Sequence, residues 1–161
     1  MGVRIVGDLG QLQATLRKMQ AVQMPPIARQ IGEALVSSTI RRFGEQKAPD
    51  GTPWQPLAAA TVAPRAKDYG KRGKIKKGAE ARLQGRKILI QSARLRNSIS
   101  ARVGGSKVAV GTNVVYARIH QFGGQAGRGK KVRIPARPYL GISRDDQEEI
   151  ARIVSAAVGG G

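Results

Sequence analysis

Cysteine is absent from the 161 residues, which excludes a disulfide framework and a site that binds metal through thiolates. No apolar run reaches about 18 residues, the length that a membrane-spanning helix requires, so we expect no contact with a membrane. Histidine occurs once, at His120, and no residue close to it in sequence completes a catalytic dyad or a zinc site. Ser92 and Ser98 have no base at a suitable spacing. We therefore predict that the protein is not an enzyme and has no catalytic residues, no cofactor and no metal site.

Aromatic and acidic residues are also few. The chain has one Trp, three Tyr and two Phe, and its 29 basic residues face only 10 acidic ones, which gives a formal net charge of +19. Such a charge favours a polyanion or an acidic protein surface as partner. A small basic nucleic-acid-binding module is one interpretation, because Lys and Arg neutralise phosphates. The helices show no recognition-helix pattern, however, and only Tyr69 in the most basic segment offers a ring for base stacking.

The apolar pattern predicts a single α+β domain over residues 1–161. We expect a mostly antiparallel sheet packed by two or three helices, with a long basic loop insertion. Apolar spacings of three and four indicate helices near 9–22, 26–43 and 144–157. Alternating apolar residues on both sides of a Gly-Gly pair predict a β-hairpin over 98–111.

Local signals place the ends of these elements. Residues 3–7 have the composition of a short opening strand, and Gly44 is expected to end the second helix. Ser143 and Asp146 indicate a short-armed capping box at the start of the last helix. A further short helix is expected to end at a Gly-Gly pair, and its apolar face comprises Val115, Ile119 and Phe122.

The segment "APDGTPWQPL" predicts an ordered turn, because it contains three prolines and an Asp-Gly pair. Asp50 and Gly51 form the tip of this turn, and Trp54 follows. A Trp side chain buries a large area, so we expect Trp54 to pin the turn to the core rather than to line a binding site.

Residues 64–87 form the most basic part of the chain, which we call the arm. It holds ten basic residues and four glycines, with Asp68 and Glu80 as its only acids. This composition supplies too little apolar surface to fold by itself, so we predict a flexible arm that becomes ordered on a partner. A solvated insertion is the alternative. The candidate partner-binding residues are Lys71, Arg72, Lys74, Lys76 and Lys77.

Residues 123–131, "GGQAGRGKK", form a Gly/Lys-rich loop that nearly matches a phosphate-binding loop. From Gly124 the pattern is G-x-x-x-x-G-K, but Lys131 stands where such a loop needs Ser or Thr to hold magnesium. The flanking segments also lack the expected strand and helix. A nucleotide hydrolase is therefore disfavoured, and we expect Arg128, Lys130 and Lys131 to contact a partner instead.

Four segments together resemble the phage virion morphogenesis family, the tail-completion proteins of tailed phages and Mu-like prophages. They are "FGEQKAPDGTPWQPLAAATVAPR", "ILIQSARLRNSISARV", "VAVGTNVVYARIHQFGG" and "VRIPARPYLGIS". Their order is specific and covers most of residues 30–157, whereas the first 25 residues and the arm contribute little to it.

The resemblance implies a structural role at the head–tail junction of the virion, after assembly in the host cytoplasm. Members look like α+β ring subunits that complete or terminate the tail and join it to the head connector. It implies self-association into a ring, expected to be a hexamer, and contacts with the tail tube protein and head–tail connector proteins. Genomic DNA in the bore of such a ring is a further nonspecific contact. A tail terminator and a head-side connector both stay open.

Overall fold

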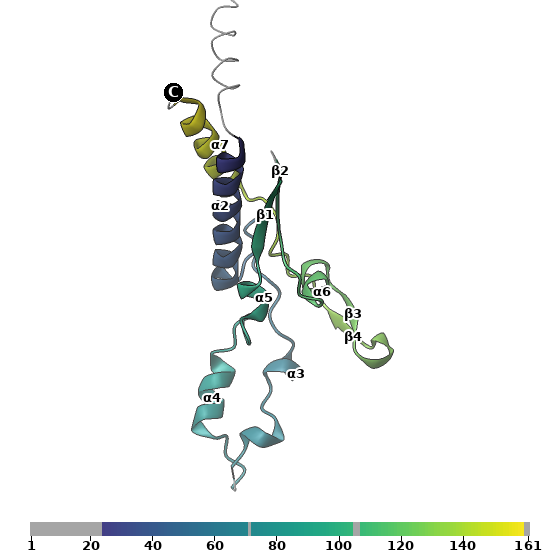
Figure 1. The fold of residues 1–161 in the computed structure, drawn as a ribbon. Coiled ribbons are helices and arrows are strands. Elements are labelled where there is room, and N and C mark those ends of the chain that lie inside the picture. Colours follow the sequence, from purple (N-terminus) through teal and green to yellow (C-terminus); the bar gives the residue numbers. More distant parts are fainter. Residues whose placement is uncertain (1–23, 71, 105–106, 160–161) are drawn as a thin grey trace, which may run out of the picture.

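The computed structural model describes residues 24–70, 72–104 and 107–159 (Figure 1). The helices are α2 (Met24–Glu45), α3 (Ala59–Val62), α4 (Lys77–Gln84), α5 (Arg94–Asn97), α6 (Ala117–Phe122) and α7 (Arg144–Gly159), with 3₁₀ turns η1 (Ala66–Asp68) and η2 (Arg128–Lys130). The strands are β1 (Ser100–Gly104), β2 (Lys107–Gly111), β3 (Gly124–Ala126) and β4 (Val132–Ile134). The strand and the helix expected at 3–7 and 9–22 lie outside the described residues.

Helices combine with antiparallel strand pairs, so the α+β class predicted from the sequence is confirmed. The pairing is divided between two hairpins, β1–β2 and β3–β4, within the described ranges. None of the helices placed there is long and apolar enough to cross a membrane.

The 22-residue helix α2 confirms the helix predicted near 26–43 and runs along one side of the body (Figure 1). It continues through Gly44, so the expectation that Gly44 ends it is wrong. Gln46 ends the helix instead, with a left-handed φ of 60°. The Gln46 side chain accepts a hydrogen bond from the amide of Ile88 at 2.6 Å and donates one to its carbonyl at 3.1 Å. These two bonds hold a residue other than glycine in a conformation that glycine usually adopts.

The hairpin predicted over 98–111 is confirmed as β1 and β2, which pair from Ser100–Gly111 to Gly104–Lys107. It lies against α2 at Gly32, where an added Cβ would stand 3.0 Å from Cβ of Ala101 and 3.4 Å from Val108. The missing side chain at this position therefore lets helix and hairpin approach closely.

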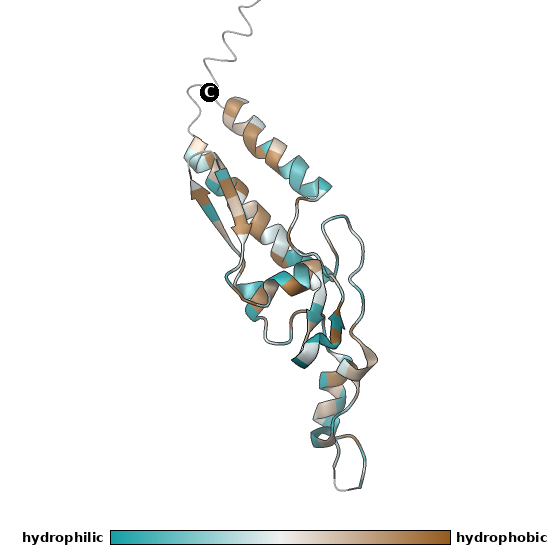
Figure 2. Ribbon diagram, turned by 90° about the vertical axis from the view of Figure 1, so that its right-hand side faces the viewer, coloured by the Kyte–Doolittle hydropathy of each residue, from teal (hydrophilic) through white to brown (hydrophobic). Residues whose placement is uncertain are grey.

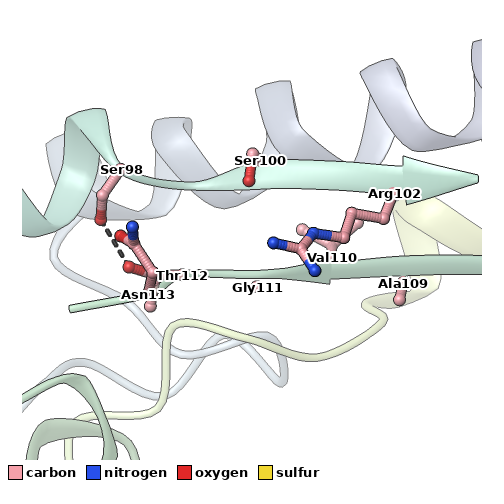
Figure 3. A pocket seen from close by; sticks show the side chains of 8 residues that line it. All are labelled: Ser98, Ser100, Arg102, Ala109, Val110, Gly111, Thr112 and Asn113. Atoms are coloured by element: carbon pink, nitrogen blue, oxygen red, sulfur yellow. Dashed lines mark hydrogen bonds between the residues drawn. The ribbon is translucent and has the colours of Figure 1, made fainter. Parts of the chain in front are cut away.

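Alternate residues of β1 and a continuous run of residues from β2 onward line a groove that Figure 3 shows from close by. Ser100 and Arg102 lie along it, and the hydroxyls of Ser98 and Thr112 are 2.5 Å apart at its end. The polar side chains of this groove come from Ser100 and Arg102 of β1 and from Ser98, Thr112 and Asn113 beside the hairpin.

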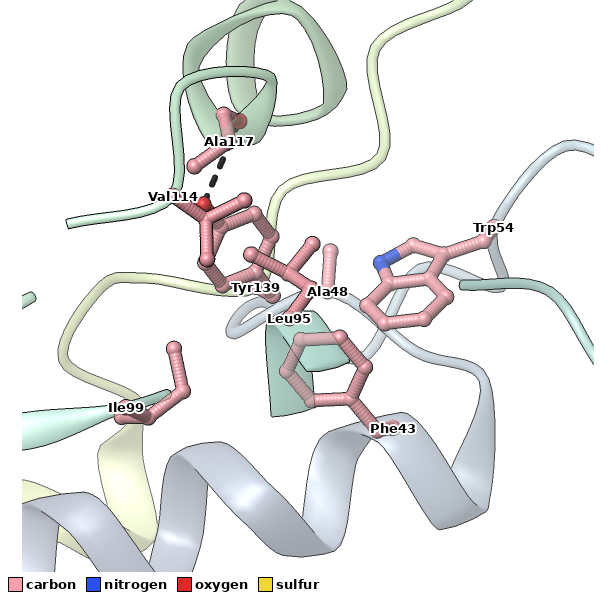
Figure 4. Close-up of a cluster of buried hydrophobic side chains, with 8 residues drawn as sticks. All are labelled: Phe43, Ala48, Trp54, Leu95, Ile99, Val114, Ala117 and Tyr139. Carbon is pink, nitrogen blue, oxygen red and sulfur yellow. Dashed lines mark hydrogen bonds between the residues drawn. The ribbon is translucent and has the colours of Figure 1, made fainter. Parts of the chain in front are cut away.

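The core gathers aromatic side chains from three distant segments (Figure 4). The ring of Phe43 lies 5.5 Å from that of Trp54, edge to face, and 5.3 Å from that of Tyr139. The indole of Trp54 donates to the carbonyl of Pro138 at 2.7 Å, and the hydroxyl of Tyr139 donates to the carbonyl of Ala117 at 3.2 Å. Trp54 is 5% exposed, so the turn that carries it is fastened to the core.

Arg42 is a buried charge beside this core, with 4% of its surface exposed. Its guanidinium donates to the carbonyls of Tyr139 at 3.2 Å and Gly141 at 2.8 Å, and to the hydroxyl of Ser38 at 3.2 Å. It also forms an ion pair with the equally buried Asp146. These bonds join α2 to the segment before α7 and to α7 itself.

Asp146 also closes the capping box predicted for α7, which is confirmed. Its carboxylate accepts from the amide of Ser143 at 2.8 Å, and the hydroxyl of Ser143 accepts from the amide of Asp146 at 3.1 Å. Figure 2 shows that the first turns of α7 are hydrophilic and that its apolar residues lie in later turns. A single carboxylate therefore both starts α7 and neutralises Arg42.

The ionisation of Asp146 is coupled to folding. Burial raises its pKa, but hydrogen bonds from Ser38 and Ser143 and the charge of Arg42 outweigh burial, so the pKa lies below its ordinary value of 3.8. The stabilisation from this carboxylate is therefore present above the ordinary pKa and is lost as the pH falls through the lowered one.

We predict that Asp146→Asn lowers the free energy of unfolding by about 3–5 kcal/mol at pH 7, because it leaves the Arg42 guanidinium buried without its counter-charge. Urea unfolding at pH 7 and at pH values falling below 3.8 measures the effect, and the difference from the unsubstituted protein should narrow as Asp146 becomes protonated.

Asp145→Asn is the matched control, because Asp145 is exposed and lies one residue earlier in the same helix. It should change the free energy of unfolding by no more than about 0.5 kcal/mol. Equal losses in the two variants would contradict the role assigned to the buried ion pair.

Candidate assembly surfaces

The arm contains short regular elements. It contains η1 and α4, and between them Tyr69 bridges to Ile75 in antiparallel fashion. The amide of Gly70 donates to the carbonyl of Lys74 at 2.8 Å, and that of Lys76 donates to the carbonyl of Asp68 at 2.8 Å. The arm therefore contains secondary structure, and its flexibility in the free subunit stays a prediction.

Asp68 provides the order that apolar surface does not. It is 2% exposed, accepts from the amide of Arg65 at 2.8 Å and pairs with Arg82. The hydrogen bond from Arg65 is the main cause that holds the pKa of Asp68 below its ordinary value, and the charge of Arg82 adds to it against the effect of burial. An acid surrounded by basic residues thus ties the two halves of the arm together.

The candidate basic residues of the arm point outward. Arg72, Lys74, Lys76 and Lys77 are exposed, whereas Lys71 lies outside the described residues. The ammonium of Lys76 donates to the carbonyl of Lys67 at 2.9 Å, which leaves it at the surface. Their contact with a partner stays a prediction.

A second projection consists of α6 and the β3–β4 hairpin (Figure 1). Gly123 joins them with a φ of 72°, and a Cβ there would stand 2.8 Å from the amide nitrogen of Ala136, so no other residue fits without movement. Arg128, Lys130 and Lys131 lie exposed at the tip of the hairpin. In Figure 1 this tip and the arm leave the body in different directions, so the two groups of basic candidates form separate surfaces.

The Gly/Lys-rich loop is not a phosphate-binding loop. Such a loop follows a strand and opens a helix. Here α6 precedes the loop, and it contains β3 and η2 and leads into β4, which is the reverse order of elements. The structure therefore argues against the nucleotide hydrolase in the same way as Lys131 does.

Two large apolar side chains at the ends of α6 face solvent. Val115, two residues before the helix, is 97% exposed, and Phe122, its last residue, is 73% exposed, whereas Ile119 is half-buried. Ala117 is the residue that α6 buries. The short helix predicted before the Gly-Gly pair is confirmed, and it leaves two large apolar side chains uncovered in the single chain.

The remaining sequence-predicted residues do not form a chemical site with these surfaces. Asp50 accepts from the amide of Thr52 at 2.9 Å, and Gly51 has a φ of 85°, so both shape the exposed tip of the turn before Trp54. The hydroxyl of Ser98 donates to the carbonyl of Leu95 at 2.7 Å. Within the described ranges no group of three His, Cys, Asp or Glu could hold a metal ion.

Comparisons with known proteins identify the family of this chain. Residues 8–159 match the model of the phage virion morphogenesis family. The chain is 32% identical over 133 residues to the tail completion protein S of Escherichia phage P2, covering 81% of each protein. It is 29% identical over 153 residues to the G protein of Escherichia phage Mu, by its name a candidate capsid assembly protein, covering 93% of this chain and 90% of that protein.

A shorter match is closer in sequence. The chain is 48% identical over 62 residues to the Mu-like prophage FluMu G protein 2 of Haemophilus influenzae, which covers 38% of this chain and 45% of that protein. The match thus spans less than half of that relative. No solved structure matches the chain.

We predict that Asp68→Asn speeds amide hydrogen exchange at Gly70 and Lys76, because it removes the charge that pairs with Arg82. Hydrogen exchange of the intact protein, read by NMR, measures this effect. Glu80→Gln is the control, since Glu80 is an exposed acid of the same arm, and it should leave exchange unchanged. Unaltered exchange in Asp68→Asn would mean that the arm is held by other bonds.

Proposed function

The chain belongs to the phage virion morphogenesis family, whose members are phage structural proteins, and from this premise we propose that it is a ring subunit that completes the tail and joins it to the head. The ring is a homo-oligomer at the head–tail junction, expected to contain six copies. Its partners are the tail tube protein on one side and the connector proteins of the head on the other.

The exposure of Val115 and Phe122 is the observation that carries this proposal. Large apolar side chains that are 97% and 73% exposed are unfavourable in a free chain and mark a surface that another protein covers. Val115 lies two residues before α6 and Phe122 is its last residue, so the two exposed side chains stand at the two ends of this short helix. A second copy of the chain is the proposed occupant, because a ring repeats one contact around its axis.

The basic arm is proposed to contact a different partner. The charge of +19 on each copy opposes close packing of arms against one another, so an acidic surface of a neighbouring ring is the favoured contact. DNA has to slide through the bore, and a tight grip by the arm would oppose that movement. Tyr69, 41% exposed, is the only aromatic residue of the arm. A protein that binds single-stranded nucleic acid uses several aromatic side chains for base stacking, so the arm lacks such a platform.

We predict that Val115→Asp prevents self-association, because it places a charge in the contact between copies. Native mass spectrometry of the purified protein at increasing ionic strength measures it. The unsubstituted protein should form larger oligomers as salt screens its charge.

Val154→Asp on α7 is the matched control, since Val154 is 41% exposed and lies on a different part of the body from α6. It should assemble as the unsubstituted protein does. A subunit that is present as a single copy in the virion would refute the ring.

We predict that replacing the arm candidates with Ser leaves the fold intact and blocks the joining of heads to tails. The substituted residues are Lys71, Arg72, Lys74, Lys76 and Lys77. Exposed ion pairs contribute about 0–1 kcal/mol each, so losing several together removes several kcal/mol of contact with an acidic surface. Lys76 is the N-cap of α4 and makes no side-chain capping bond, so Ser at this position is compatible with the helix.

The measurement is the fraction of heads joined to tails, counted in electron micrographs of particles made with the variant. A control variant makes the same change of charge at five exposed basic residues outside both projections, namely Arg29, Lys47, Arg94, Arg102 and Lys107. Normal joining with the arm variant would make the arm a solvated insertion, and a variant that does not fold would make it part of the core.

A further inference from the structure

A pocket of about 280 Å³ lies where the base of the arm meets α6. Leu57, Leu89 and Leu95 form apolar walls, and Tyr116 lies at the side of α6. The basic side chains that line the pocket are Arg86, Lys87, His120 and Arg137. None of the lining residues is acidic.

Two buried polar atoms of this pocket lack a hydrogen-bond partner. They are Nε of Arg86 and Nδ1 of His120, and the described chain contains no other buried side-chain nitrogen or oxygen without a partner. Buried polar groups are paired in nearly all native structures, so two unpaired ones that occur together indicate a missing partner. The Nε–H group of Arg86 can only donate, and Nδ1 of His120 donates when it carries the proton, so one acceptor can satisfy both. Arg86 and His120 both line this pocket, so a ligand that enters it can reach both unpaired nitrogens.

Charge at the pocket is also uncompensated. Arg137 is 5% exposed and donates to the carbonyls of Gln55 at 2.8 Å and Pro56 at 2.9 Å, and it forms no ion pair among the described residues. Burial lowers the pKa of Arg137. Burial, and then the charge of Arg137, lower the pKa of His120. An anion in the pocket would relieve both effects, because it stabilises the charged forms.

We propose that this pocket binds a carboxylate presented by another protein chain as a glutamate side chain, whose oxygens accept hydrogen bonds from Arg86 and His120. The leucine walls suit the methylene groups of such a side chain, and the guanidinium suits its head. A backbone phosphate of a nucleic acid has no apolar stem of this kind. The inference holds for any protein partner and does not require the proposed ring.

The single histidine makes the pocket directly observable. His120 is the only imidazole in the chain, so one pair of proton signals in the NMR spectrum of the whole protein reports on the site. The probe is N-acetyl-glutamate N-methylamide, and N-acetyl-glutamine N-methylamide is its neutral counterpart. The glutamate probe should shift the His120 signals to saturation and raise the pKa of His120, whereas the glutamine probe should do neither.

Arg86→Gln should weaken binding of the glutamate probe by about tenfold or more, the typical effect of losing a hydrogen bond to a charged group. Arg94→Gln removes the same charge from an exposed position of α5 and should leave binding unchanged. Because Arg86 also donates to the carbonyl of Thr61, Arg86→Lys is a second variant, and it should keep part of the affinity.

Three results would overturn the inference. They are no response of His120 to the glutamate probe, an equal response to the glutamine probe, and equal weakening by Arg94→Gln, which would indicate general attraction to a basic surface. Inorganic phosphate is tested as a third probe. If phosphate binds more tightly than the glutamate probe and its binding depends on Arg86, the pocket is a phosphate site and the inference is also overturned. If the glutamate probe does not bind, the proposed ring is not affected, because the contact between copies involves Val115 and Phe122 and is tested separately by Val115→Asp.

Discussion

The guanidinium of Arg42 places a full positive charge inside the body, and its neighbours are arranged to satisfy it. Ser38, the carbonyls of Tyr139 and Gly141, and the carboxylate of Asp146 all accept from it. A buried charge is tolerated only when it is paired and fully hydrogen-bonded, so the chain before α7 has to pass this point. The carboxylate of Asp146 therefore both fixes the start of α7 and neutralises Arg42 of α2. The aromatic cluster lies next to this ion pair.

This arrangement leaves much of the chain outside the body. The arm is held by Asp68 and Arg82, and the second hairpin contains only short strands. Basic side chains cover both projections, and the apolar side chains of Val115 and Phe122 are uncovered at the ends of α6. A subunit of a larger assembly is expected to have these properties, because neighbours supply the contacts that a free chain lacks. The membership of a virion morphogenesis family agrees with such a design.

Local patterns made much of the fold predictable. The hairpin over 98–111 follows from alternation, and the capping box of Ser143 and Asp146 follows from their spacing. Long-range polar contacts could not be predicted: Arg42 and Asp146 are 104 residues apart, and neither has a local sign of its partner. The spacing of Val115, Ile119 and Phe122 predicts the short helix α6, but a period does not indicate which of these side chains face solvent. The pocket at His120 could not be predicted either, because Arg86 and Arg137 reach it from segments far apart in sequence.

The hydrogen bond from Arg86 to the carbonyl of Thr61 determines how a change in the length of the arm affects the rest of the chain. It joins two residues that are 25 positions apart and so closes the arm into a loop with fastened ends. The entropy cost of closing a loop grows only slowly with its length, so residues between these ends can be gained or lost with little effect on the body. Insertions and deletions between Thr61 and Arg86 are therefore expected to leave the packing of the body unchanged.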